Sequence, residues 1–118
     1  MCGIVGYTGN KPAQEIVIES LKKLEYRGYD SSGIALHEGE IVFSKKEGPI
    51  ANLESVLGSS NSKIAIAHTR WATHGVPSDV NSHPHLSNDG KIAVVHNGTI
   101  DNYLDIKSSL ESEGFNFL

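Results

Sequence analysis

The residue with the clearest potential for nucleophilic chemistry is Cys2, the second residue of the chain and its only cysteine. A thiol attacks a carbonyl carbon as the thiolate, so a cysteine nucleophile needs a base that removes its proton. Removal of Met1 would leave Cys2 with a free α-amine. Terminal amines have pKa values of about 7.7–8.0, so such a group can take the thiol proton and return it to a leaving amine. The alternative is a small buried side chain that happens to lie early in the sequence.

Acyl transfer also needs hydrogen-bond donors directed at the oxygen that gains negative charge. The side-chain amide of Asn97 and the backbone N–H of Gly98 suit that task. An amide donates without carrying charge, and glycine lets a substrate approach the backbone closely. Asn-Gly is also a strong turn signal, so the dipeptide taken alone is compatible with a simple turn.

A third group of polar and aromatic residues lies between positions 68 and 96, where the only tryptophan and five of the six histidines occur. Arg70 offers a planar fork of donors that suits a carboxylate, and Trp71 beside it could cover a small ligand. The alternative has Arg70 paired with a surface acid and Trp71 in the core. Concentrating such side chains in loops at strand ends is typical of a functional site.

Two other classes of function remain open from these residues. A metal site could be built from the histidines of this region, which are His68, His74, His83, His85 and His96. However, no carboxylate or second cysteine stands at the usual ligand spacing, and no His-Glu-x-x-His pattern is present. We therefore interpret these histidines as hydrogen-bonded loop and pocket residues and expect neither a metal nor another cofactor. The third possibility is an interaction module without catalysis.

The elements that must position these residues alternate between strands and helices. A helix that Asn10 caps, with Pro12 in its first turn, is predicted to end near Gly28. A hairpin is expected to turn through Glu38-Gly39, joining strands at 33–37 and 40–45. The remaining predicted elements are strands at 4–8, 63–67 and 91–95, helices at 49–57 and 102–112, and a further strand from 115. This order predicts an α+β fold with a largely antiparallel sheet.

Composition narrows the classes of partner. With 118 residues the chain has the size of one domain, and its formal net charge of −4 argues against nucleic acid and anionic membranes. No apolar run approaches the ~20 residues of a membrane span. A single cysteine and the absence of a secretory signal at the start lead us to expect a cytoplasmic protein.

Five blocks of sequence, taken in order, resemble those of a known family. They are residues 1–6, 26–33, 68–75, 81–85 and 96–98. Together they resemble the glutaminase domain of class II glutamine amidotransferases, which are N-terminal-nucleophile hydrolases. The resemblance spans nearly the whole chain and implies a four-layer α-β-β-α sandwich.

The resemblance implies a role for each matching residue. Cys2 matches the nucleophile that attacks the side-chain amide of L-glutamine and forms a glutamyl thioester. Asn97 and Gly98 match the oxyanion hole, and Arg70 matches the residue that holds the glutamine α-carboxylate. The other matching residues are Trp71, Thr73 and His74 in the loop that closes over glutamine, and Arg27 and Gly28 beside the terminal amine.

Details of the blocks favour one branch of the family. The alternative branch is the amidophosphoribosyltransferases. They usually have Gln or Glu at the position of Tyr29 and Tyr-Ser at the positions of Trp71 and Ala72. The His83-Pro84-His85 block also favours the branch that converts fructose 6-phosphate to glucosamine 6-phosphate. In that branch a separate C-terminal half binds the sugar phosphate, and we expect the full-length enzyme to be a homo-oligomer.

The resemblance further implies that residues 1–118 are the N-terminal half of a type-2 glutamine amidotransferase domain. The sequence does not reach the family's Thr-Asp-Thr-Glu stretch, whose Asp binds the glutamine α-amino group. One wall of the substrate pocket is therefore expected to come from elsewhere. We expect these 118 residues on their own to have little or no activity.

Overall fold

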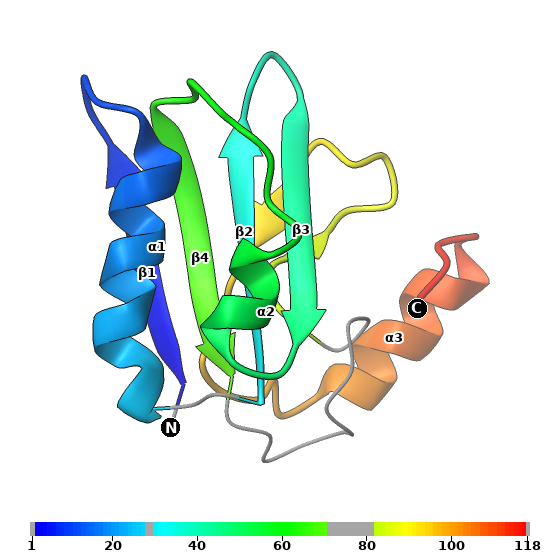
Figure 1. The fold of residues 1–118 in the computed structure, drawn as a ribbon. Helices are drawn as coiled ribbons and strands as arrows, with labels where there is room; N and C mark the ends of the chain where they lie inside the picture. Colours follow the sequence, from blue (N-terminus) through cyan, green and yellow to red (C-terminus); the bar gives the residue numbers. More distant parts are fainter. Residues whose placement is uncertain (1, 28–29, 71–81, 118) are drawn as a thin grey trace.

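A computed structural model describes residues 2–27, 30–70 and 82–117, which form an α+β arrangement (Figure 1). The elements, in chain order, are β1 (Gly3–Thr8), α1 (Ala13–Leu24), the 3₁₀ turn η1 (Glu25–Arg27), β2 (Ser31–His37), β3 (Ile41–Glu47), α2 (Ile50–Glu54), β4 (Ile64–Arg70), β5 (His85–Leu86), β6 (Ala93–Val94) and α3 (Tyr103–Ser112). The predicted order of strands and helices is thus confirmed over most of the chain.

A four-stranded antiparallel sheet in the order β1-β4-β2-β3 forms the centre of the described residues. The hairpin between β2 and β3 turns at Gly39, whose φ of 80° is a conformation that glycine adopts without steric cost. In the central strand β4, His68 lies opposite Ile4 of β1 on one side and Gly33 of β2 on the other. This register puts His68 in the middle of the sheet.

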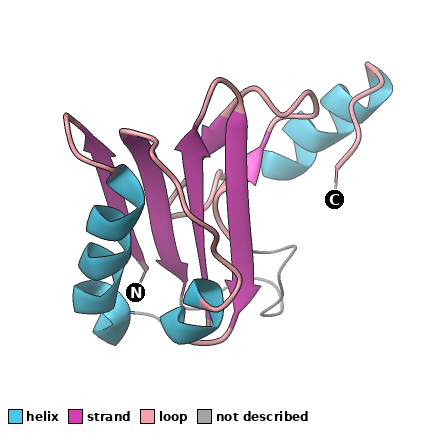
Figure 2. Cartoon of the chain, turned by 45° about the horizontal axis from the view of Figure 1, so that its top comes forward, coloured by secondary structure: helices cyan, strands magenta, loops and turns pink. Residues whose placement is uncertain are grey.

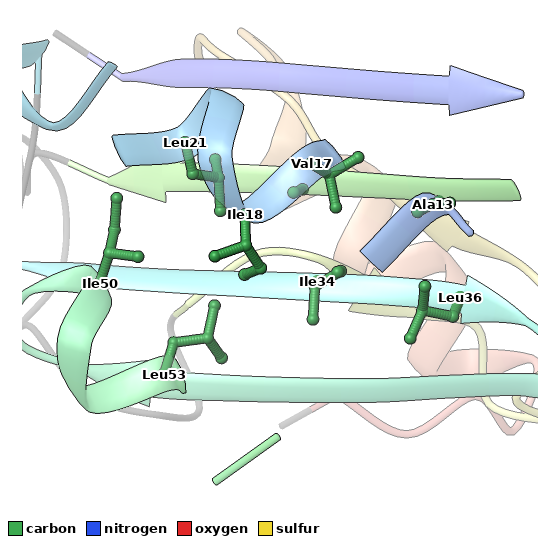
Figure 3. Packing of buried hydrophobic residues seen from close by; sticks show 10 residues of the cluster. Ala13, Val17, Ile18, Leu21, Ile34, Leu36, Ile50 and Leu53 are labelled. Carbon is green, nitrogen blue, oxygen red and sulfur yellow. The ribbon is translucent and has the colours of Figure 1, made fainter. Parts of the chain in front are cut away.

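Helices α1 and α2 cover one face of this sheet. Their buried side chains recur at helical spacing, as the sequence predicts, so each helix presents an apolar stripe to the strands. Figure 3 shows Ile18 of α1 and Ile50 and Leu53 of α2 in one core cluster with Ile34 of β2. Because neighbouring side chains of a strand point to opposite faces, His68 and Arg70 of β4 face away from this core.

The other face of the sheet carries residues 82–86 and the small antiparallel sheet of β5 and β6. Figures 1 and 2 show this second sheet on the side opposite α1 and α2, while α3 lies off to one side of the sheets and buries none of its side chains. Gly33 permits the close approach of the 82–86 segment, because a Cβ at that position would overlap the carbonyl oxygen of His83. The segment before β5 therefore packs on the first sheet at His68, where the His83 ring stacks on it.

Several boundaries differ from the sequence prediction. Asn10 does not cap α1. The helix begins after Pro12, and the first helical N–H, that of Ala13, donates to the carbonyl oxygen of Ser62 at 2.7 Å. The cap is therefore a backbone group from a distant loop, which local sequence does not reveal.

The strand boundaries differ as well. Strand β4 continues to Arg70, so three residues expected in a loop, His68, Thr69 and Arg70, belong to the sheet, and β6 has only two residues of the predicted 91–95. Strand β5 was not expected. Residues 115–117 form no strand, and the N–H of Phe115 instead donates to the carbonyl oxygen of Leu110 at 3.1 Å, closing the end of α3. No helix among the described residues is long and apolar enough to cross a membrane.

Candidate active site

The candidate site lies where the start of β1, the end of β4 and the segment after β6 meet. Cys2, directly before β1, is half-buried. Asn97 follows β6, and its Nδ2 donates a hydrogen bond to the carbonyl oxygen of Cys2 at 3.1 Å. The structure therefore brings together the predicted nucleophile and the predicted amide donor, which are 95 positions apart.

The other end of the Asn97 carboxamide is also held. Its Oδ1 lies 2.7 Å from Nε2 of His68, whose side chain is completely buried on β4. Both hydrogen bonds act on one planar group, so they fix its rotation as well as its position. Gly98, the next residue, has a φ of 143°, and a Cβ there would lie 3.3 Å from the His96 ring.

Arg70 occupies the last position of β4 and is only 8% exposed. It lies two residues after His68, on the same face of the strand. Its positive charge contributes to the lowered pKa values of His68, His83 and His85, although burial is the larger cause for each. The site therefore combines a guanidinium cation with imidazoles that are neutral at pH 7.

Three histidine rings pack against one another beside these residues. The His68 and His83 rings are stacked, with centroids 4.2 Å apart and planes inclined by 22°. His85 follows at 4.4 Å from His83. Burial lowers the pKa of His83 to about 3, with smaller contributions from His68 and His85. The backbone N–H of His96 donates to Nδ1 of His83 at 3.3 Å, which ties the segment after β6 to this cluster.

Among the described residues, no group of three or more His, Cys, Asp or Glu side chains is arranged so that it could hold a metal ion. The contacts of His68 are a hydrogen bond to Asn97 and a ring stack on His83. Both agree with the interpretation of these histidines as hydrogen-bonded pocket residues. His74, the remaining member of the proposed set, lies outside the described residues.

Other predicted site residues fall where the structure gives no description. Gly28, Trp71, Thr73 and His74 lie outside the described residues. For Arg27 the backbone belongs to η1, but its side chain is not described. Their predicted roles around the terminal amine and over the substrate stay predictions.

The sequence did not reveal the contact of His68 with Asn97, since it indicated His68 only as a metal ligand or a general pocket residue. One signal could have found it. His68 and Arg70 are two positions apart in a strand, so their side chains lie on the same face of the sheet. If one of them belongs to a site, the other is expected beside it. The end of the predicted strand at residue 67 concealed this relationship.

Comparison with known proteins relates the chain to one family. A family model described as "Glutamine amidotransferase domain" matches residues 54–118. A glutamine–fructose-6-phosphate aminotransferase (isomerizing) from Clostridium perfringens is 56% identical over 99% of this chain and 20% of its own length. The enzyme of the same name from Caldanaerobacter subterraneus is 57% identical over 100% of this chain and 20% of its own length. The chain thus spans about a fifth of the curated relatives that it matches.

Solved structures agree on the fold. The glutamine phosphoribosylpyrophosphate amidotransferase from B. subtilis, complexed with ADP and GMP, superposes with a TM-score of 0.83. It is 31% identical, and the match covers 100% of this chain and 26% of that chain. A structure described as the allosteric regulatory enzyme of purine biosynthesis gives a TM-score of 0.85 at the same identity.

Proposed function

The chain belongs to the glutamine amidotransferase domain family, and we propose that it carries the glutaminase site of a glutamine–fructose-6-phosphate aminotransferase. In this proposal the site releases ammonia from L-glutamine, and the ammonia aminates fructose 6-phosphate. The observation that supports it most directly is the hydrogen bond from Asn97 to Cys2, since it puts a neutral donor next to a potential nucleophile.

The proposed reaction begins with Cys2 as the mature first residue, after removal of Met1. Its α-amine takes the thiol proton, and Sγ attacks the carbon of the glutamine side-chain amide. The carbon–sulfur bond forms, the carbon–nitrogen bond breaks, and the amine returns the proton to the leaving nitrogen, which departs as ammonia. Water then hydrolyses the glutamyl thioester and releases glutamate.

Asn97 and Gly98 are the proposed donors to the oxygen that becomes negative during this attack. The amide nitrogen of Asn97 carries two N–H groups, and one of them is used on the Cys2 carbonyl. Among the described residues the other N–H has no further partner, so it can donate to the tetrahedral intermediate. The backbone N–H of Gly98 would supply the second donor.

Arg70 is the proposed partner of the glutamine α-carboxylate. A guanidinium binds a carboxylate through two parallel hydrogen bonds, and partial burial strengthens such a pair. Trp71, Thr73 and His74 are proposed to close over the bound glutamine, while Arg27 and Gly28 orient the terminal amine. These assignments rest on the family resemblance.

The choice of acceptor rests on sequence identity. The two glutamine–fructose-6-phosphate aminotransferases compared above share 56% and 57% of residues with this chain, whereas the superposed phosphoribosylpyrophosphate amidotransferase shares 31%. We therefore favour fructose 6-phosphate, bound by a part of the protein outside these residues. We further propose that residues 1–118 are the N-terminal half of the amidotransferase domain, and that the complete protein is a cytoplasmic homo-oligomer.

The decisive experiment uses the complete protein that carries these residues. Intact-mass measurement is expected to show that Met1 is absent. The chloroketone analogue of L-glutamine should label Cys2 with one equivalent, and L-glutamine should protect the thiol. A protein that retains Met1 yet hydrolyses glutamine would contradict the amine as base, and one that neither labels nor hydrolyses glutamine would contradict the proposed function.

A further inference from the structure

His68 occupies a position that no step of the proposed reaction uses. Its ring is fully buried in β4, and its Nε2 lies 2.7 Å from Oδ1 of Asn97. Its neighbours in the sheet register are Ile4 and Gly33, neither of which offers a polar side chain. A polar ring in this position is usually retained for a hydrogen bond that it makes.

The orientation of the Asn97 amide follows from its two partners. The carbonyl oxygen of Cys2 can only accept a hydrogen bond, so the nitrogen end of the carboxamide must face Cys2. The oxygen end therefore faces His68, and that oxygen can also only accept. Nε2 of His68 must consequently carry a hydrogen and donate it.

Only one ring nitrogen of His68 carries a proton at neutral pH. Burial lowers the pKa of His68, so the imidazole is neutral and has a single N–H. Nδ1 is buried, and no residue in the described part of the chain pairs with it. The proton is thus kept at Nε2, because only there does the N–H have an acceptor.

The ring is also held in place from its flat side. His83 stacks on His68 with 4.2 Å between centroids, and the N–H of His96 donates to the Nδ1 of His83. Gly33, beside His68 in the register, leaves the space in which the His83 segment reaches the sheet. The imidazole is therefore fixed by a stack, by its strand and by Asn97.

We propose that His68 is a positioning residue, which through its Nε2–H sets the end of the Asn97 carboxamide that faces Cys2. This inference rests on the proposed function, in which Asn97 stabilises the oxyanion. If the carboxamide turned by 180°, its oxygen would face the Cys2 carbonyl and the developing negative charge. The rate of thioester formation would then fall while glutamine binding through Arg70 would persist.

Three variants of the complete protein separate positioning from packing. His68→Phe keeps an aromatic ring for the His83 stack and removes the donor, whereas His68→Gln loses the ring and keeps an N–H near the place of Nε2. His68→Asn carries the same amide one methylene shorter, near the place of Nδ1, where it cannot reach Asn97. We expect the Gln variant to retain more glutaminase activity than either the Phe or the Asn variant.

The expected kinetic signature lies in kcat. His68→Phe should lower kcat for glutamine hydrolysis by about tenfold or more, as for loss of one hydrogen bond, with KM changed less than about twofold. In the Asn97→Ala background the same substitution should change kcat by less than about twofold, because nothing remains to be positioned. If the His68 ring were needed only for packing, the losses in kcat from His68→Phe and Asn97→Ala would be additive. The Phe variant would then be more active than the Gln variant.

The outcomes also distinguish this inference from the proposed function. If the unsubstituted protein hydrolyses no glutamine, the proposed function fails. If it is active and His68→Phe is as active as the parent, or the effects of His68→Phe and Asn97→Ala are additive, only the positioning role fails. Should His68→Phe not fold, judged by its thermal unfolding, the comparison of Gln with Asn decides: equal activities of the two variants overturn the inference.

Discussion

Asn97 Nδ2 donates a hydrogen bond to the main-chain carbonyl oxygen of Cys2 at 3.1 Å, although 95 positions separate the two residues in the chain. This contact joins the segment after β6 to the start of β1. Since the same carboxamide accepts from His68, three segments that are distant in sequence meet at one planar group. The geometry of the proposed oxyanion hole therefore depends on how the two sheets pack.

Replacing Asn97 with alanine tests its proposed catalytic role. Asn97→Ala is expected to lower kcat for glutamine hydrolysis by about 10²–10³-fold, because a donor to the charged oxygen is lost. KM for glutamine should change little, since Arg70 is the proposed contact for the carboxylate. Steady-state kinetics of the complete protein measure both quantities. A large rise in KM at constant kcat would instead assign Asn97 to ground-state binding.

Replacing Gly33 with alanine tests whether the 82–86 segment packs closely on the sheet. A Cβ at this position would overlap the carbonyl oxygen of His83, a backbone atom that cannot rotate away. Gly33→Ala is therefore expected to destabilise the fold by about 1–3 kcal/mol and to lower glutaminase activity by displacing His83 from His68. The measurements are chemical denaturation and glutamine hydrolysis.

Gly6 is the matched control, because a Cβ on this other strand glycine would meet no atom within 4 Å. Gly6→Ala should change the free energy of unfolding by no more than about 0.5 kcal/mol. Equal stability of the two alanine variants would show that the His83 segment does not press on β2.

The α2 helix contributes to the core through Leu53, which is 0% exposed. Leu53→Ala removes apolar contacts and leaves a cavity, so it is expected to cost about 2–5 kcal/mol of stability. Val56, two residues beyond the helix and 50% exposed, is the control, and Val56→Ala should cost less than about 0.5 kcal/mol. Denaturation curves of the two variants would contradict the core assignment if their midpoints were equal.

The buried histidines predict a pH dependence of stability. Burial lowers the pKa values of His68, His83 and His85 in the folded state, that of His83 to about 3. The unfolded chain, with imidazole pKa values of about 6.5, therefore binds more protons than the folded chain below that pH. Stability from these residues is complete above about pH 7 and decreases as the pH falls from about 6.5 toward 3.

Thermal unfolding at a series of pH values between 7.5 and about 4.5 measures this effect. His83→Gln should reduce the decrease in melting temperature over this range, because its side chain takes up no proton on unfolding. His37→Gln, which changes an exposed histidine at the end of β2, is the control for replacing a histidine outside the buried cluster. A pH profile identical in the parent and His83→Gln would contradict the buried neutral state.

Local patterns in the sequence were enough to predict most of the elements and the kinds of chemistry available. The spacing of Ala13, Val17 and Leu21 predicted an amphipathic helix, and Glu38-Gly39 predicted the hairpin turn, because both signals arise from residues close together in the chain. The resemblance carried by the five blocks predicts Cys2 and Asn97 as partners in one reaction, although it shows no contact between them.

Which groups meet depends on packing between segments that are distant in the chain, and local patterns do not reveal it. Periodicity states which face a residue occupies, but not which distant segment covers that face. The cap of α1 is a backbone carbonyl from a loop, and the partner of His68 is an amide 29 positions away. Both contacts depend on how the strands are ordered and paired. A shift of one residue in the pairing would turn the His68 side chain to the opposite face of the sheet. The pairing of His68 with Asn97 is for that reason a property of the packed sheets.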